Sequence, residues 1–368
     1  MDNIFANFFS DVSAVCGHEA TLHANFMHQL LLDGVPSGCI EREHAFDGKR
    51  VDLVLSATRR DGTWVDAGEV LVAFEFKGGA YNTRNALCDE INAEGYCSDL
   101  DKLASLRRRG IECWFVCTDM AELGVALSDA ARLRVAAQCA RRGIHFAYHA
   151  QDRSECTIAR AGAGTARIPL RSAQRPSLRD PRWQDCMPAL APLLHKASFT
   201  EDTAAGIVYH ALQEAGLGAG QVSLETYFCC AQGKGRMQKR PDICVFGDRV
   251  AGRFNLYRNG DRKRHNDGIK IGDLRALIEI KGSNGASRGS AQAFAVQIAA
   301  DIEKLAEWRM RLDQSGYLPS AGAATHPDYV MIAFDNRKIP LATAMVDELH
   351  QQANHHAVQF HYLRVAPR

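Results

Sequence analysis

The chain has 368 residues, of which 46% are hydrophobic; this excludes a disordered protein and favours two domains over one compact core. Its 44 Lys and Arg residues balance 43 Asp and Glu residues, which excludes no class of partner because binding depends on local patches. Twelve cysteines without a CxxC pair indicate reduced thiols, and no apolar run has the length of a membrane-spanning helix. We therefore expect a cytoplasmic protein without membrane contact.

The first part of the chain alternates helical and extended patterns. Residues 18–46 have the pattern of an amphipathic helix, a glycine-containing turn and a strand. Two strands, a helix, a strand, another helix and a last strand follow, and the segments with the clearest pattern are 50–55, 70–79, 98–106, 113–119 and 143–149. A helix between the last strands predicts a parallel crossover beside an antiparallel hairpin, and hence a mixed sheet.

The same order of elements returns in the second part of the chain. Residues 200–228 align with residues 18–46 without a gap, at an offset of 182 residues. Identical residues at this offset include Glu19 and Glu201, Thr21 and Thr203, and His28 and His210. The later segments also have counterparts, at 240–246, 276–283, 300–308, 329–335 and 357–363. The chain therefore contains an internal repeat.

These patterns predict an α/β protein of two tandem lobes, each a mixed β-sheet flanked by helices. We place the N-terminal lobe at residues 1–150 and the C-terminal lobe at residues 198–368. Residues 151–197 contain five prolines and many arginines and interrupt the pattern. This segment is expected to be an irregular linker with one short helix.

Two apolar strands carry charges that an ordinary core strand would lack. "VLVAFEFKGG" and "ALIEIKGS" each contain Glu-x-Lys, and the strand before each has one aspartate near its start. These residues are Asp52, Glu75 and Lys77 in the first half and Asp242, Glu279 and Lys281 in the second. An isolated carboxylate on an apolar strand costs several kcal/mol unless it is compensated, and a divalent cation compensates it well.

An Asp followed by Glu-x-Lys on the next strand, after a helix with a glutamate, resembles the PD-(D/E)XK nuclease superfamily, the restriction-endonuclease-like fold. The second half matches the motif literally at Pro241-Asp242, whereas Val51 replaces the proline in the first half. The resemblance covers most of both halves and implies Mg²⁺-dependent phosphodiester hydrolysis at two sites, with Mn²⁺ as a substitute ion. It makes the six residues above catalytic, their carboxylates metal ligands, and the helix residues Glu19 and Glu201 additional metal ligands.

Several residues near the motif leave their role open. Glu43 and Glu225 match at the repeat offset, which fits either a role in the site or strand-end carboxylates that bind backbone groups. His28 and His210 lie in the middle of helices and are expected to be packing or surface residues rather than metal ligands. Asp99 with Lys102 and Asp301 with Lys304 form i,i+3 pairs on the later helices, and at least one of these is expected to be a surface ion pair. The lower-ranked alternative places Lys102 and Lys304 near the scissile phosphate.

Positive charge gathers beside the motif in the second half. Residues 234–270 contain 11 Lys and Arg against 4 Asp, with the pattern of a long basic hairpin. The alternative is an ordinary solvated hairpin. An arginine also follows each motif lysine by seven residues. The predicted contacts to nucleic acid are Arg84, Arg288, Arg258, Arg262, Lys263 and Arg264.

The sequence thus predicts a Mg²⁺-dependent DNA endonuclease whose fused sites act as a pseudo-dimer on double-stranded DNA. By analogy, such an enzyme serves restriction or phage defence. Two alternatives stay open: a nucleic-acid-binding scaffold of the same fold with one or both sites inactive, and a repair nuclease or RNase of the same superfamily. No P-loop is present, so no nucleotide cofactor is expected, and the oligomeric state stays open.

Overall fold

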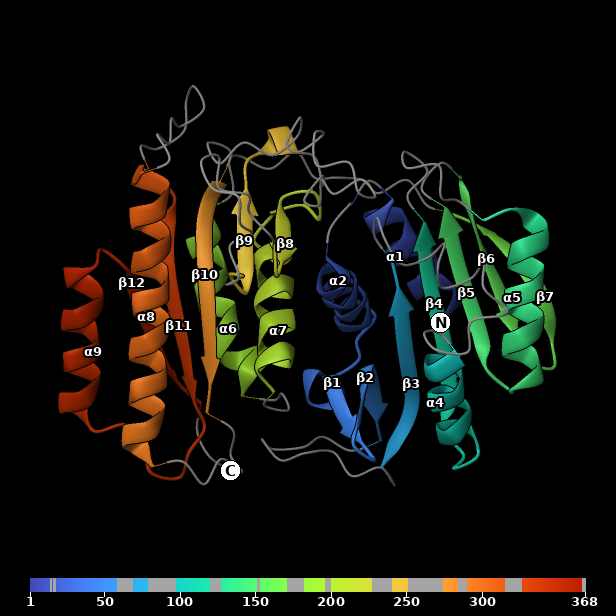
Figure 1. The fold of residues 1–368 in the computed structure, drawn as a ribbon, viewed down its shortest axis with the longest axis horizontal. Helices are drawn as coiled ribbons and strands as arrows, with labels where there is room; N and C mark the ends of the chain where they lie inside the picture. Colours follow the sequence, from blue (N-terminus) through green and yellow to red (C-terminus); the bar gives the residue numbers. More distant parts are fainter. Residues whose placement is uncertain are drawn as a thin grey trace.

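The computed structural model describes residues 1–13, 15, 18–57, 69–78, 97–119, 127–150, 153–170, 182–195, 200–226, 240–250, 274–283, 290–314 and 326–365. Within these ranges the chain forms an α/β structure with two mixed β-sheets, of seven and five strands, flanked by helices. The prediction of mixed sheets between helices is confirmed. In Figure 1 the two sheets lie on either side of a central pair of helices.

The seven-stranded sheet contains the first half of the repeat. Its strands lie in the order of the sequence: β1 (Ile40–Phe46), β2 (Lys49–Ser56), β3 (Val70–Lys77), β4 (Glu112–Asp119), β5 (His145–Ala150), β6 (Glu155–Arg160) and β7 (Gly164–Pro169). The pairs β3–β4 and β4–β5 are parallel and the other pairs are antiparallel. The helices α4 (Cys97–Arg107) and α5 (Asp129–Arg141) connect the parallel strands.

Helices cover both faces of this sheet, which explains why residues 113–117 of its central strand are apolar without alternation. α1 (Asp2–Val12) and α2 (Glu19–Leu32) pack in one hydrophobic cluster, and α4 and α5 pack in another. On β4, Trp114 and Val116 belong to the first cluster, whereas Cys113 and Phe115 belong to the second. A strand buried on both faces has no polar side to alternate with its apolar side.

The five-stranded sheet repeats the same plan. Its spatial order is β12–β11–β10–β9–β8, and the strands are β8 (Val222–Leu224), β9 (Ile243–Phe246), β10 (Leu274–Gly282), β11 (Asp328–Asp335) and β12 (Gln359–Arg364). β8, β9 and β10 are antiparallel neighbours, and β10, β11 and β12 are parallel neighbours. The crossovers contain α8 (Ala291–Gln314) and α9 (Thr343–His355). Among the described helices, none is long and apolar enough to cross a membrane.

Part of the segment that the sequence predicts as an irregular linker belongs to the first sheet. β6 and β7 form an antiparallel hairpin beside β5, so the prediction is wrong for Glu155–Pro169. β7 is an edge strand with mostly exposed residues, and an exposed strand has no apolar alternation to reveal it. The expected short helix is present as α6 (Met187–Leu194), which follows η3 (Trp183–Cys186) and packs against α7 (Glu201–Glu214).

The contact between α2 and α7 joins the two halves. The amide of Leu224 donates to Oγ1 of Thr21 at 2.9 Å, and the amide of Arg42 donates to Oγ1 of Thr203 at 2.9 Å. These two bonds are equivalent under the offset of 182 residues. An interface in which two equivalent positions make reciprocal contacts has two-fold symmetry, so the halves are related by an approximate two-fold axis.

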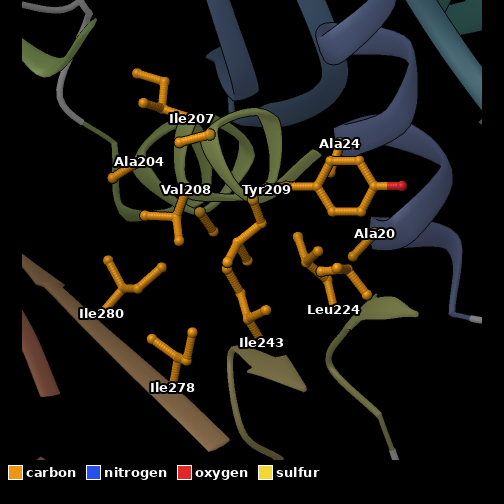
Figure 2. Packing of buried hydrophobic residues seen from close by; sticks show 14 of the residues in the cluster. Ala20, Ala24, Ala204, Ile207, Val208, Tyr209, Leu224, Ile243, Ile278 and Ile280 are labelled. Atoms are coloured by element: carbon orange, nitrogen blue, oxygen red, sulfur yellow. The ribbon is translucent and has the colours of Figure 1, made fainter. Parts of the chain in front are cut away.

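Both central helices are buried on all sides, whereas an amphipathic helix is buried on one face only. Ala20 to Leu30 of α2 and Thr203 to Leu212 of α7 are buried. In Figure 2, Val208 lies on the side of α7 that faces Ile243, Ile278 and Ile280 of the second sheet, whereas the ring of Tyr209 extends toward α2. The Tyr209 hydroxyl accepts a hydrogen bond from the Asn25 amide at 3.2 Å, which links the two helices.

His28 and His210 meet on the axis, as expected for packing residues. Their Nδ1 atoms lie 2.8 Å apart, which requires one ring to donate and the other to accept. Burial and the neighbouring ring lower the pKa of His28 to about 3, and burial lowers the pKa of His210 to about 4. Both rings are therefore neutral in the folded protein at neutral pH.

We predict that this pair makes the fold sensitive to acid. Above the ordinary pKa of 6.5 the rings are neutral in both states, but below it the unfolded chain binds protons that the folded chain excludes. The free energy of unfolding should fall by up to about 1.4 kcal/mol per pH unit per histidine as the pH decreases from 6.5 toward 4. Urea unfolding at pH 7 and pH 5 measures this loss.

The double variant His28→Gln/His210→Gln, whose amides can hydrogen-bond without titrating, should lose at least about 2 kcal/mol less than the wild type between these pH values. The exposed residue His355 provides the control, since His355→Gln should leave the pH dependence as it is. An unchanged slope in the double variant would show that the pair does not control acid stability.

Candidate active site

In both sheets, three carboxylate residues lie in line across three neighbouring strands. Leu53 pairs with Phe74, and one position earlier on β2 Asp52 lies opposite Glu75 of β3. Glu43 of β1 lies opposite Asp52, between the paired positions on either side. Side chains at directly opposite positions share a face of the sheet, so the register gathers these carboxylates.

The second sheet has the same alignment. Ile243 pairs with Ile278, which places Asp242 opposite Glu279, and the amide of Glu225 donates to the carbonyl of Asp242 at 3.1 Å. Glu43 and Glu225 share a further property, because their φ angles are 52° and 51°. A left-handed backbone is unfavourable for glutamate, and such strain clusters at functional sites.

A backbone hydrogen bond fixes each motif aspartate. Oδ2 of Asp52 accepts from the amide of Phe76 at 2.7 Å, and Oδ2 of Asp242 accepts from the amide of Ile280 at 2.7 Å. Each donor is the central residue of Glu-x-Lys. The spacing in the motif thus gives the aspartate a backbone donor from the neighbouring strand, while the side chains of the flanking glutamate and lysine lie on the same face of the sheet as the aspartate.

The motif lysines bridge two helices. Nζ of Lys77 lies 3.3 Å from Glu19 at the start of α2 and 3.3 Å from Asp99 of α4. In the second half, the corresponding contacts of Lys281 are 3.1 Å to Glu201 and 3.2 Å to Asp301. The predicted helix glutamates therefore do lie beside the motif.

A second lysine from the crossover helix pairs with each motif glutamate. Nζ of Lys102 lies 2.6 Å from Glu75, and Nζ of Lys304 lies 2.7 Å from Glu279. Only 1% and 2% of these glutamate side chains are exposed. Lys102 also contacts Asp99 at 3.2 Å, but the expectation of simple surface ion pairs is wrong, because both lysines reach into the site.

Glu43 and Glu225 each pair with the arginine that stands two residues before the motif aspartate. Glu43 lies 3.9 Å from Arg50, and Glu225 lies 2.5 Å from Arg240. Of the two roles that the sequence leaves open, these contacts favour a place at the edge of the site. The arginines were missed in the sequence, although both stand at the same distance from their aspartate.

Burial shifts the titration of the site toward the protonated carboxyl form. It raises the pKa of Glu19 and of Asp242 to about 7, and it raises the pKa of Glu75 and Glu279 well above the ordinary value. Among the described residues, Asp52 and Asp242 have no lysine or arginine within ion-pair distance. In each half, the carboxylates outnumber the cationic side chains, and such a donor set fits a divalent cation.

The first site also contains a histidine that the motif does not predict. Burial lowers the pKa of His23 well below its ordinary value, so the ring is neutral. Glu19, His23 and Asp52 have potential ligand atoms that all lie within 4.8 Å of one another. The signal in the sequence was the i,i+4 spacing of Glu19 and His23, which puts both on one face of α2.

The structure thus gathers Glu19, Asp52, Glu75 and Lys77 in one place, and it brings Glu201, Asp242, Glu279 and Lys281 together in the other half.

The predicted nucleic-acid contacts lie outside the described residues; they are Arg84, Arg288, Arg258, Arg262, Lys263 and Arg264. No protein-family model matches this chain, and comparisons with curated proteins and with solved structures find no match. The geometry of the site therefore carries the functional argument.

We predict that Lys304 stabilises the folded protein through its contact with the buried Glu279 side chain. Lys304→Met removes the only cation that the structure places against this buried carboxylate among the described residues. Removing one partner of a buried ion pair costs about 3–5 kcal/mol, so urea unfolding at neutral pH without divalent metal should show a loss of that order.

Arg311→Met provides a matched control on the same helix. Arg311 pairs with Glu307 at the surface, and an exposed i,i+4 pair contributes only about 0.3–0.5 kcal/mol. Equal losses in the two variants would mean that the buried contact between Lys304 and Glu279 adds no more stability than a surface ion pair.

Proposed function

We propose that this chain is a metal-dependent endonuclease of the PD-(D/E)XK type, built from two tandem restriction-endonuclease-like lobes. The observation that carries the proposal is the duplication of one complete set of contacts. In each half the aspartate binds the central amide of Glu-x-Lys, the motif lysine binds a helix glutamate, and the motif glutamate binds a helix lysine. If the Asp and the Glu-x-Lys triplet occurred by chance, we would not expect the motif to recur in the second half together with the same contacting residues.

The residues present fit a divalent cation, most simply Mg²⁺, with Mn²⁺ as a substitute. Glu19, Asp52 and Glu75 would hold it in the first half, and Glu201, Asp242 and Glu279 in the second. When bound, the ion supplies positive charge to the phosphodiester and lowers the pKa of water. The protein contributes the rest: the backbone amide that fixes the aspartate, and a lysine Nζ that can donate to the attacking water or to a phosphate oxygen.

Double-stranded DNA is the substrate that best fits the symmetry. Its two strands are related by two-fold axes, and a protein with two-fold symmetry places equivalent groups on both. The reciprocal contacts of Thr21 and Thr203 give the two sites such a relation. The predicted arginine and lysine contacts would supply the phosphate-binding charge. Restriction or phage defence is the role that we infer by analogy.

Plasmid cleavage tests whether both sites act. Lys77→Ala and Lys281→Ala should each convert double-strand cutting into nicking, with linear product formed about 10²-fold more slowly, since each removes a donor to the charge that develops in one site. The double variant should neither nick nor cut.

If one of these single variants cuts both strands like the wild type, that half is not catalytic. If the wild-type protein leaves duplex, single-stranded and branched DNA and RNA intact in Mg²⁺ and Mn²⁺, the nuclease proposal fails.

Calorimetric titration with Mg²⁺ tests the metal separately. We expect two ions per chain, and Asp52→Asn and Asp242→Asn should each abolish one of them, since Asn preserves the size of the side chain but not its charge. Because the metal binds the folded state, it should raise the free energy of unfolding by about 2.7 kcal/mol at 100 times its Kd. A chain that binds DNA but no metal would instead be a scaffold of this fold.

A further inference from the structure

The two sites differ at one position of their central helices. At the repeat offset of 182 residues, His23 of α2 corresponds to Ala205 of α7, whereas Glu19 corresponds to Glu201. Both helices therefore begin with the site glutamate, but only α2 has a nitrogen ligand one turn later on the same face. Among the described residues, the group of Glu19, His23 and Asp52 is the only cluster of three with metal-ligand spacing.

His23 is buried without a hydrogen-bond partner. Only 4% of its side chain is exposed, and neither ring nitrogen makes a hydrogen bond to any described residue. A buried polar group without a hydrogen-bond partner destabilises the folded state by about 1–3 kcal/mol. A ligand bound to the ring nitrogens would remove this cost. The aromatic face contact with Phe76, at 5.1 Å between ring centroids, fixes the ring without satisfying either nitrogen.

The ring points its two nitrogens at different carboxylates. Nε2 lies 3.6 Å from Oδ2 of Asp52, which is a member of the site, and Nδ1 lies 3.7 Å from Oε1 of Glu43. Histidines that bind metals commonly have a carboxylate at the nitrogen that does not face the metal, and this carboxylate sets the tautomer and the orientation of the ring. Glu43 stands in that position, with the left-handed backbone noted above.

The corresponding glutamate of the second half, Glu225, makes different contacts. Glu225 lies 2.5 Å from Arg240 and 3.6 Å from His18. Position 205, which corresponds to His23, is alanine, so in the described part of this half no counterpart of the His23 ring lies between Glu225 and Asp242. The second site consequently offers carboxylate oxygens from Glu201, Asp242 and Glu279, whereas the first adds a nitrogen.

We infer that the two sites prefer different metals: His23 makes the first a mixed nitrogen and oxygen site that binds a first-row transition-metal ion in preference to Mg²⁺, while the second is an oxygen-only Mg²⁺ site. Imidazole suits transition metals, whereas Mg²⁺ prefers oxygen ligands and retains its waters. This inference rests on the proposed function only in using the same two sites. It deepens that function, because a chain with little transition metal would have one competent site and would nick rather than cut.

Manganese is the probe, because its electron spin reports directly bound nitrogen. With less than one Mn²⁺ per metal-free chain, pulsed electron paramagnetic resonance should show the modulation of a coordinated ¹⁴N nucleus. His23→Ala, which gives the first site the residue of the second, should remove this modulation and weaken the tighter Mn²⁺ site about tenfold or more, since even outer partners of a ligand are worth 10–100-fold. An excess of Mg²⁺ should displace Mn²⁺ from the second site first.

Two further histidine variants serve as controls. His18→Ala tests whether the nitrogen comes from the ring beside Glu225, and His355→Ala removes an exposed imidazole; both should keep the modulation. If His23→Ala does not fold, as judged by its thermal unfolding without metal, His23→Gln takes its place, because it removes the ring but keeps a polar side chain.

The outcomes separate the inference from the proposed function. Two bound Mn²⁺ ions without nitrogen modulation, or modulation that persists in both His23 variants, would overturn the inference while leaving a two-site nuclease intact. Absence of any Mn²⁺ or Mg²⁺ binding would overturn both. Loss of the modulation in the His23 variants, together with retained Mg²⁺ binding at the second site, would establish the difference even if no DNA is cut.

Discussion

The packing of α2 against α7 is the contact on which both candidate sites depend. These helices join the two sheets, and each begins with the glutamate of its own site, Glu19 or Glu201. Thr21 and Thr203 accept the amide of a strand residue in the opposite half, which fixes each helix start against the other sheet. The position of the acidic side chain in one half therefore depends on hydrogen bonds that the other half donates, and neither site is an independent unit.

Buried charge is the second constraint. The sheets place carboxylates in line across three strands, where burial disfavours ionisation, and the nearby helices supply lysines that restore it in part. The lysines do not balance the carboxylates, and an apolar replacement at these positions would be more stable in a protein without a ligand. Both halves contain this excess of buried carboxylates over lysines, with the same contacts, and a bound cation would compensate the excess charge in each.

Much of the fold could be predicted from the sequence, because periodicity and the internal repeat reveal buried strands and their order. The hairpin β6–β7 was missed because its outer strand is exposed, and the all-round burial of α2 and α7 was missed because it depends on a partner far along the chain. The motif was found by its spacing and its recurrence, and the helix glutamates were expected from the resemblance to a known superfamily. The roles of Lys102 and Lys304 were not, since an i,i+3 pair on a helix looks the same whether its lysine reaches solvent or a buried glutamate.

The approximate symmetry also limits how the two halves can differ. Contacts on the axis, such as the histidine pair, bind equivalent positions to each other, so a change there alters both halves at once. A position whose printed contacts lie within one half, as those of His23 with Glu43, Asp52 and Phe76 do, can change singly. His23 and Ala205 differ between the halves in this way. The spacing from the motif aspartate to the motif glutamate also differs, because it is longer in the second half. The structure thus conserves the relative placement of the two sites while leaving free the ligands within each one, and a difference in metal preference is a difference that this architecture can accommodate without disturbing the fold.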